Sequence, residues 1–148
     1  MLERMRSLLE TRCGQAGMTL SMELADADKN THIHTDQSAV EQIIFNLIDN
    51  ACKYAACAED CRIHLTTARQ GRHISFRVCD HGEGLQRHEA KKLFKPFRKS
   101  AQAAAQSAPG VGLGLALCRQ LARQLGGDLT YEDRAEAGAC FVLRLPCR

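Results

Sequence analysis

The sequence contains no tryptophan, only two tyrosines and only three prolines among its 148 residues. With so few aromatic rings to stack on bases and a net charge of only +3, the chain lacks the features of a nucleic-acid-binding protein. No apolar run approaches the length of a membrane span, and the N-terminal stretch MLERMRSLLE lacks the apolar centre of a signal peptide. We therefore expect neither nucleic-acid binding nor direct membrane contact.

Eight cysteines are present, but no two of them form a C-x-x-C pair. Cys52, Cys57 and Cys61 are loosely spaced, and His32 and His34 alternate in a strand-like stretch, so a zinc site built from these residues is one interpretation. The other is that the cysteines are reduced, mostly buried and act as small apolar side chains. We favour the second, because nothing points to secretion and a chain of this length needs no disulfide staples.

The length and the apolar fraction of 45% fit one domain, residues 1–148, with a single core. Apolar spacing predicts helices over residues 1–16, 36–51, 89–94 and 113–125, and alternation predicts strands over residues 18–24, 62–68, 73–79, 128–131 and 140–145. Residues 69–72 read as a hairpin turn, Asp36 as an N-cap and Gly126-Gly127 as a helix stop. This order predicts a mixed sheet with helices packed on one face. The predicted helix faces are Val40, Ile43, Ile44, Leu47, Ile48 and Ala51 in the second helix, and Leu113, Leu117, Leu121 and Leu125 in the last.

Three glycines, at positions 110, 112 and 114, alternate with apolar residues directly before the last predicted helix. Glycines admit close backbone approach, and the first amides of a helix attract anions, so the segment suits a phosphate group. An ordinary flexible loop is the alternative. The pattern matches neither G-x-G-x-x-G nor the G-K-[ST] of a P-loop, so its meaning depends on the rest of the chain.

Polar side chains share one face of the predicted helix in NLIDNACKYA, residues 46–55. Asn46 and Asn50 are four residues apart, and Lys53 follows three residues later, close to the same stripe. Amide oxygens suit Mg²⁺ and an ammonium suits phosphate, so the stripe is typical of a magnesium-phosphate site. A solvated polar face is the alternative.

Two further segments contain candidate ligand-binding residues. In DHGEGL, residues 80–85, Asp80 directly follows a predicted strand, where its carboxylate could accept a hydrogen bond from an exocyclic amine such as that of adenine. A plain Asp-Gly turn is the alternative. In LFKPFRKS, residues 93–100, two phenylalanines bracket a proline and precede two cations, a composition that suits a lid over phosphates.

These four segments, in this order, resemble the N, G1, F and G2 boxes of the ATP-binding domain of sensor histidine kinases, within the group that includes gyrase B, Hsp90 and MutL. The boxes correspond to residues 46–54, 80–84, 94–97 and 110–115, and the similarity extends to the closing GACFVLRLP. The resemblance implies the Bergerat fold, a two-layer α/β sandwich with a mostly antiparallel sheet of about five strands against about three helices. It also implies ATP and Mg²⁺ as cofactors and a lid over residues 86–111.

By this resemblance, Asn50 would ligate Mg²⁺ beside Asn46, and Lys53 would contact phosphate, so that Asn46 and Lys53 would serve catalysis. Asp80 would bond the adenine amine. Cys140 stands where the family commonly has Thr or Ser near adenine. The full nucleotide-binding set implied is Asn46, Asn50, Lys53, Tyr54, Asp80, Gly82, Gly84, Leu85, Phe94, Phe97, Arg98, Lys99, Gly110, Val111, Gly112, Leu113, Gly114, Leu115 and Cys140.

Asn46 distinguishes subfamilies, because ATP-hydrolysing relatives resemble one another in having a glutamate there. A carboxylate can act as a general base whereas an amide cannot, so Asn46 favours a kinase whose acceptor is a neutral histidine. The alternatives are a degenerate nucleotide-binding regulatory module, and an ATPase or serine kinase with another base, for which Glu41 points away from the Asn46–Asn50 face.

The resemblance implies a cytoplasmic, monomeric domain and leaves the membrane anchoring of its parent kinase open. It also implies two partners: a histidine-bearing dimerisation domain and a response regulator. None of the six histidines lies in a His-Glu-x-x-x-Pro pattern, and the chain starts at the helix that normally follows the dimerisation domain. We therefore expect a fragment or separately made domain that does not autophosphorylate alone.

Overall fold

The computed structural model describes residues 1–25, 31–55, 59–84, 87–95, 114–132 and 138–147. Its longest helix, α2 (Gln37–Tyr54), forms where the apolar spacing is most regular. The Asp36 carboxylate caps this helix by accepting a hydrogen bond from the Ala39 amide at 3.2 Å, as predicted. All six apolar positions predicted for its inner face are buried, so this part of the sequence analysis is confirmed.

Five strands form one mixed sheet in the order β1-β2-β3-β5-β4. Their bounds are β1 (Thr19–Glu23), β2 (Arg62–Gln70), β3 (His73–Cys79), β4 (Asp128–Glu132) and β5 (Cys140–Pro146). β1 pairs with β2 in parallel, and the three other pairings are antiparallel. The hairpin predicted with its turn at residues 69–72 is confirmed. The turn itself is confined to residues 71–72, because Gln70 still pairs with His73.

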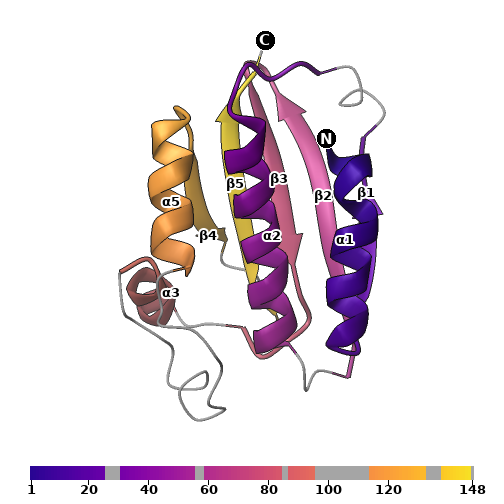
Figure 1. The fold of residues 1–148 in the computed structure, drawn as a ribbon. Helices are drawn as coiled ribbons and strands as arrows, with labels where there is room; N and C mark the ends of the chain where they lie inside the picture. Colours follow the sequence, from indigo (N-terminus) through magenta and orange to yellow (C-terminus); the bar gives the residue numbers. More distant parts are fainter. Residues whose placement is uncertain (26–30, 56–58, 85–86, 96–113, 133–137, 148) are drawn as a thin grey trace.

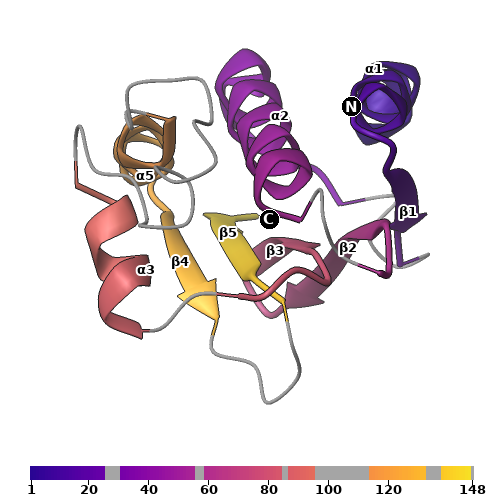
Figure 2. The same cartoon turned by 90° about the horizontal axis from the view of Figure 1, so that it is seen from below.

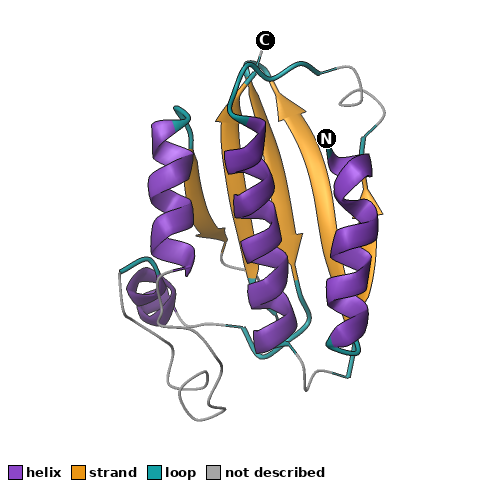
Figure 3. Cartoon of the chain, in the orientation of Figure 1, coloured by secondary structure: helices purple, strands orange, loops and turns teal. Residues whose placement is uncertain are grey.

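The helices form a second layer on one face of the sheet (Figures 1 and 2). Helices α1 (Leu2–Gln15), α2 and α5 (Gly114–Gln124) run side by side over the strands. A shorter helix, α3 (Arg87–Leu93), lies beside the lower end of α5, and begins two residues earlier than predicted (Figure 3). This arrangement confirms the two-layer α/β sandwich. In the described ranges, no helix is both long and apolar enough to cross a membrane.

The inner face of α5 differs from the row of leucines that the spacing predicted. Leu117 is 46% exposed, whereas Leu115, Cys118 and Ala122 are buried. A strict four-residue row drifts around a helix with 3.6 residues per turn, so it cannot face one partner along its whole length. Leu115 and the smaller Cys118 and Ala122 therefore form the inner face, and Leu121 and Leu125 are partly buried against the core.

Two glycines, Gly126 and Gly127, end helix α5, and the second has no room for a side chain. Gly126 has a φ of 84°, and the Gly127 amide donates to the Ala122 carbonyl at 2.9 Å, which closes the helix as predicted. A Cβ at Gly127 would overlap the carbonyl oxygen of Arg144 on β5. Any side chain here would therefore push the end of α5 away from the sheet.

We predict that Gly127→Ala lowers the free energy of unfolding by about 2 to 3 kcal/mol, because the backbone must shift to admit the methyl group. The matched control is Gly14→Ala in α1, where an added Cβ would meet nothing within 4 Å. That substitution should raise stability by about 0.5 to 1 kcal/mol. Chemical denaturation measures both, and equal stabilities of the two variants would contradict the packing argument.

Candidate functional site

The predicted site segments meet at one end of the molecule. The last turn of α2, the end of β3, the start of β5 and the start of α5 lie together at the lower end in Figure 1. Gly82 lies against the end of α2, since a Cβ there would be 3.2 Å from the Tyr54 carbonyl oxygen. The fold therefore brings together segments 46–54 and 80–84, which are far apart in the sequence.

Asp80 carries the one charged side chain that is buried in the described part of the chain, with 4% of its surface exposed. Its Oδ1 accepts hydrogen bonds from the amides of Gly82 at 2.9 Å and Ala139 at 3.1 Å. The Asp80 amide in turn donates to the Ala139 carbonyl at 3.0 Å. The carboxylate at the end of β3 is therefore held in one direction by backbone groups from two segments.

Gly138 allows these two segments to pack backbone against backbone. It is buried with a φ of 118°, and a Cβ at this position would overlap the Asp80 carbonyl oxygen. Gly84 approaches it from the other side, because a Cβ on Gly84 would be 2.8 Å from the Gly138 carbonyl oxygen. The sequence analysis assigned no role to Gly138, although a glycine two residues before a predicted strand was the available signal.

One residue of the polar stripe of α2, Asn46, contacts α5. The Asn46 amide nitrogen donates to Cys118 Sγ at 3.4 Å, and burial raises the pKa of the Cys118 thiol, which keeps it neutral. Asn50 and Tyr54 follow one and two turns later and are half-buried, and burial raises the pKa of the Tyr54 hydroxyl. Of the predicted stripe, Asn46 therefore lies on the side of α2 next to α5.

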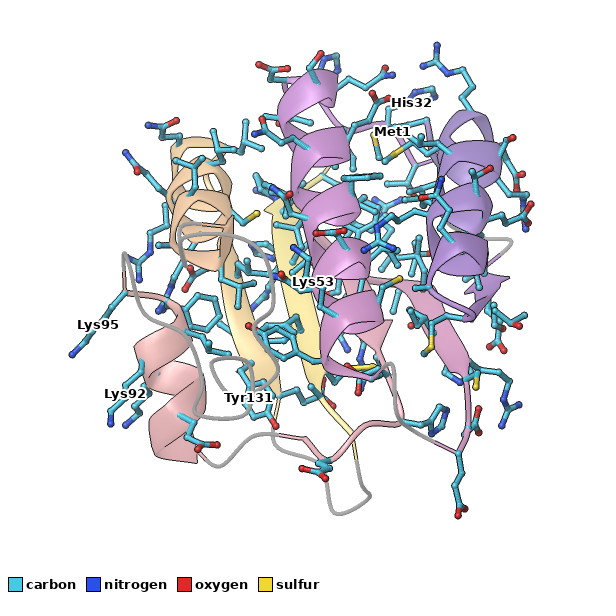
Figure 4. All side chains as sticks on the ribbon, turned by 60° about the horizontal axis from the view of Figure 1, so that its bottom comes forward. Met1, His32, Lys53, Lys92, Lys95 and Tyr131 are labelled. Carbon is cyan, nitrogen blue, oxygen red and sulfur yellow. A yellow bond between two sulfur atoms is a disulfide. The ribbon has the colours of Figure 1, made fainter. Side chains whose placement is uncertain are left out.

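Lys53 is engaged by an ion pair that the sequence analysis missed. Its Nζ lies 3.0 Å from Asp49 Oδ2, and Arg12 Nε of α1 donates to Asp49 Oδ1 at 2.7 Å. Burial alone would raise the pKa of Asp49, but the hydrogen bonds and charges of Lys53 and Arg12 outweigh it and lower that pKa. The four-residue spacing was a signal for the first pair, whereas Arg12 becomes a neighbour only through the packing of α1 on α2. Figure 4 shows Lys53 on α2.

Phe94 anchors the chain directly after α3. Its ring meets Phe141 of β5 edge to face, with centroids 6.0 Å apart, and the Arg119 guanidinium of α5 lies 4.9 Å from its centroid. Lys92 and Lys95 project outward from the molecule in this region (Figure 4). Arg119 had no assigned role in the sequence analysis.

Several predicted site residues lie outside the described ranges, and so does most of the predicted lid at residues 86–111. They are Leu85, Phe97, Arg98, Lys99, Gly110, Val111, Gly112 and Leu113. Of the predicted phosphate loop, Gly114 and Leu115 are described and form the first turn of α5.

The expectation of reduced cysteines is wrong for one pair. Cys79 and Cys140 lie directly opposite each other on β3 and β5 and form a disulfide, because that register places their Cα atoms 4.1 Å apart. The free cysteines in the described ranges are Cys13, Cys52, Cys61, Cys118 and Cys147, of which only Cys61 is exposed. Within those same ranges, no group of three or more His, Cys, Asp or Glu residues is placed to hold a metal ion, so nothing there supports the zinc interpretation.

Comparison with known proteins identifies the family. Residues 35–148 match the family described as histidine kinase-, DNA gyrase B-, and HSP90-like ATPase. The chain belongs to this family. Two curated relatives align with most of the chain. The sensor protein KdpD of Escherichia coli is 34% identical to this chain over 132 residues. The signal transduction histidine-protein kinase AfsQ2 of Streptomyces coelicolor is 34% identical over 136 residues. These alignments cover 89% and 92% of the chain but only 14% and 24% of the relatives.

Solved structures show the same fold. The catalytic domain of the histidine kinase ThkA superposes with a TM-score of 0.79 at 23% identity, covering 97% of this chain and 90% of that one. Full-length ShkA in complex with AMPPNP also gives a TM-score of 0.79, at 24% identity, covering 99% of this chain and 29% of that one. The ATPase-family domain described here therefore has the architecture of histidine kinase catalytic domains.

The ion pairs of Asp49 with Lys53 and Arg12 predict that the stability of the fold depends on pH. The folded-state pKa of Asp49 is lowered, so its contribution to stability is present above the unfolded pKa of about 4 and is lost as pH falls through the folded value. Asp49→Asn should lower the free energy of unfolding by about 1 to 2 kcal/mol at pH 7, with the difference shrinking below about pH 4.

Urea denaturation between pH 3 and pH 7 measures this difference. The control is Glu3→Gln, which removes an exposed pair with Arg6 and should change stability little. A deficit in Asp49→Asn that stays constant down to pH 3 would contradict the ion-pair account.

Proposed function

We propose that this chain binds Mg-ATP and presents its γ-phosphoryl group for transfer to a histidine on a separate dimerisation domain in two-component signalling, with a response regulator as the next partner. The observation that carries the proposal is the buried, backbone-held carboxylate of Asp80, two residues before Gly82, which lies against the end of α2. The histidine kinases among the relatives, and the AMPPNP complex of ShkA, support it.

In this proposal, Asp80 recognises the adenine ring. A carboxylate in a buried position makes stronger hydrogen bonds than one in water, and it rejects partners that offer no donor. With Oδ1 aligned by two backbone amides, the carboxylate is pre-oriented to accept a hydrogen bond from the exocyclic amine of adenine. Cys140, which lies on the neighbouring strand, would be close to the same base.

In this proposal, residues of α2 and α5 bind the phosphates and the metal ion. The side chain of Asn50 would hold Mg²⁺, a hard cation that suits amide oxygens, and Asn46 would lie beside it with its amide held by Cys118. When bound, the metal would neutralise charge on the phosphates. Lys53 would exchange Asp49 for a phosphate oxygen, and the amides at the start of α5 would bind phosphate through the positive end of the helix dipole.

Asn46 also favours phosphoryl transfer over ATP hydrolysis, because hydrolysis uses a general base and an amide cannot take a proton from water. The alternative base, Glu41, accepts a hydrogen bond from Gln37 in the first turns of α2, at the opposite end of the helix from Tyr54. Nine residues of helix place Glu41 about 13 Å along the axis from Asn50. Phosphoryl transfer to an imidazole, which is already a nucleophile, needs no such base.

We predict that calorimetric titration with a non-hydrolysable ATP analogue shows binding that weakens at least tenfold without Mg²⁺ and at least about tenfold in Asp80→Asn. The matched control is Asp36→Asn at the far end of α2, since asparagine caps a helix as well as aspartate does. No binding by the unaltered chain would refute the proposal, and unchanged affinity in Asp80→Asn would refute the adenine assignment.

We also predict that the purified chain incubated with γ-labelled ATP forms no acid-labile phosphohistidine, because none of its histidines lies in the acceptor pattern. Label should appear when a histidine-bearing dimerisation domain is supplied in trans. Phosphohistidine on the chain alone would contradict the assignment of the acceptor to a separate domain.

A further inference from the structure

The Cys79–Cys140 disulfide lies at the edge of the Asp80 site. β3 ends at Cys79 and β5 begins at Cys140, so the pair forms the last rung of the ladder between these two central strands. The next residues on either side are Asp80 and Ala139, which hydrogen-bond to each other. The covalent bond therefore directly adjoins the contacts that orient the Asp80 carboxylate.

Without the covalent bond, the position of Asp80 would depend on weaker contacts. The end of a strand ladder opens more readily than its middle, because its hydrogen bonds are supported from one side only. Here those bonds are Asp80 N to Ala139 O at 3.0 Å and Ala139 N to Asp80 Oδ1 at 3.1 Å. A disulfide at the adjacent rung prevents the two strands from separating and so keeps both bonds formed.

We propose that Cys79 and Cys140 are a reversible redox modification site that sets the affinity of the Asp80 site for the adenine ring of a nucleotide. The disulfide form is the tight-binding state, because the carboxylate is pre-oriented, and the dithiol form is the weak-binding state. This inference rests on the proposed function and adds its regulation. The resemblance implies a cytoplasmic domain, and disulfides in that reducing compartment are mostly transient or redox-sensing, which fits a switch better than a structural staple.

The other cysteines in the described part of the chain lack this arrangement. Cys13 and Cys52 lie with their sulfurs 3.9 Å apart in the buried interface of α1 and α2, and are not bonded. Cys118 contacts Asn46 and has a raised pKa, so it is a poor nucleophile. Cys61 is exposed, which makes it the control for non-specific effects of reductant.

A dithiol reductant supplies the two electrons that convert the Cys79–Cys140 disulfide into two thiols. Cys79 is half-buried whereas Cys140 is fully buried, so a thiolate of the reductant attacks Cys79 Sγ. The S–S bond breaks, and its electron pair leaves on Cys140 Sγ, which takes up a proton. The second thiol of the reductant then attacks the mixed disulfide, closes a ring disulfide and releases Cys79 as a thiol. Two electrons pass to the protein, and a disulfide oxidant reverses the step.

The test compares the oxidised chain with the chain treated with dithiothreitol, after mass spectrometry of alkylated thiols has established each redox state. Titration with a non-hydrolysable ATP analogue and Mg²⁺ should show affinity about fivefold lower after reduction. Cys79→Ser should bind like the reduced chain under both conditions. Cys61→Ser, the matched control, should keep the full response to reductant.

Hydrogen exchange on the unaltered chain provides a second readout that needs no variant. The amides of Gly82 and Ala139, which donate to Asp80, should exchange faster after reduction, whereas amides in the middle of β3 should not change.

Each outcome separates the two proposals. Equal, measurable affinity in both redox states, or tighter binding after reduction, overturns the switch and leaves the proposed function standing. No affinity in either state overturns the proposed function and the switch with it. A bond that resists excess dithiothreitol in the native chain, or a Cys79→Ser variant that still responds to it, also overturns the switch.

Discussion

The site depends on the burial of one carboxylate. Removing Asp80 from water is costly unless its oxygens find fixed donors, and the fold supplies these from the Gly82 and Ala139 amides. That arrangement requires β5 to start beside the end of β3, and requires a residue without a side chain at position 138. The order of strands in the sheet and one glycine are therefore conditions for the orientation of a single side chain.

Helix α2 connects this carboxylate to the rest of the site. Its apolar face forms much of the core, and its last residue, Tyr54, lies against Gly82, two residues after Asp80. Two contacts hold α2 from opposite sides: Asn46 meets Cys118 of α5, and Asp49 meets Arg12 of α1.

The sequence predicted what depends on local pattern and missed what depends on long-range packing. The inner face of α2 and its Asp36 cap followed from spacing and capping chemistry, and both were confirmed. The row of leucines predicted for α5 was wrong at Leu117, which is exposed, whereas Leu115, Cys118 and Ala122 are buried. The Cys79–Cys140 bond could not be predicted, since it depends on the register of two strands 61 residues apart. The roles of the site residues remain predictions.

The most direct test of the account is the chemical identity of the group that Asp80 binds. Adenine carries an exocyclic amine at C6 where hypoxanthine carries a carbonyl oxygen, so a carboxylate that accepts from adenine should reject hypoxanthine. Binding of ADP and of inosine diphosphate can be followed through the amide resonances of Gly82 and Ala139. The account predicts that ADP shifts both resonances and that inosine diphosphate does so only at far higher concentration. Equal affinities for the two nucleotides would contradict it.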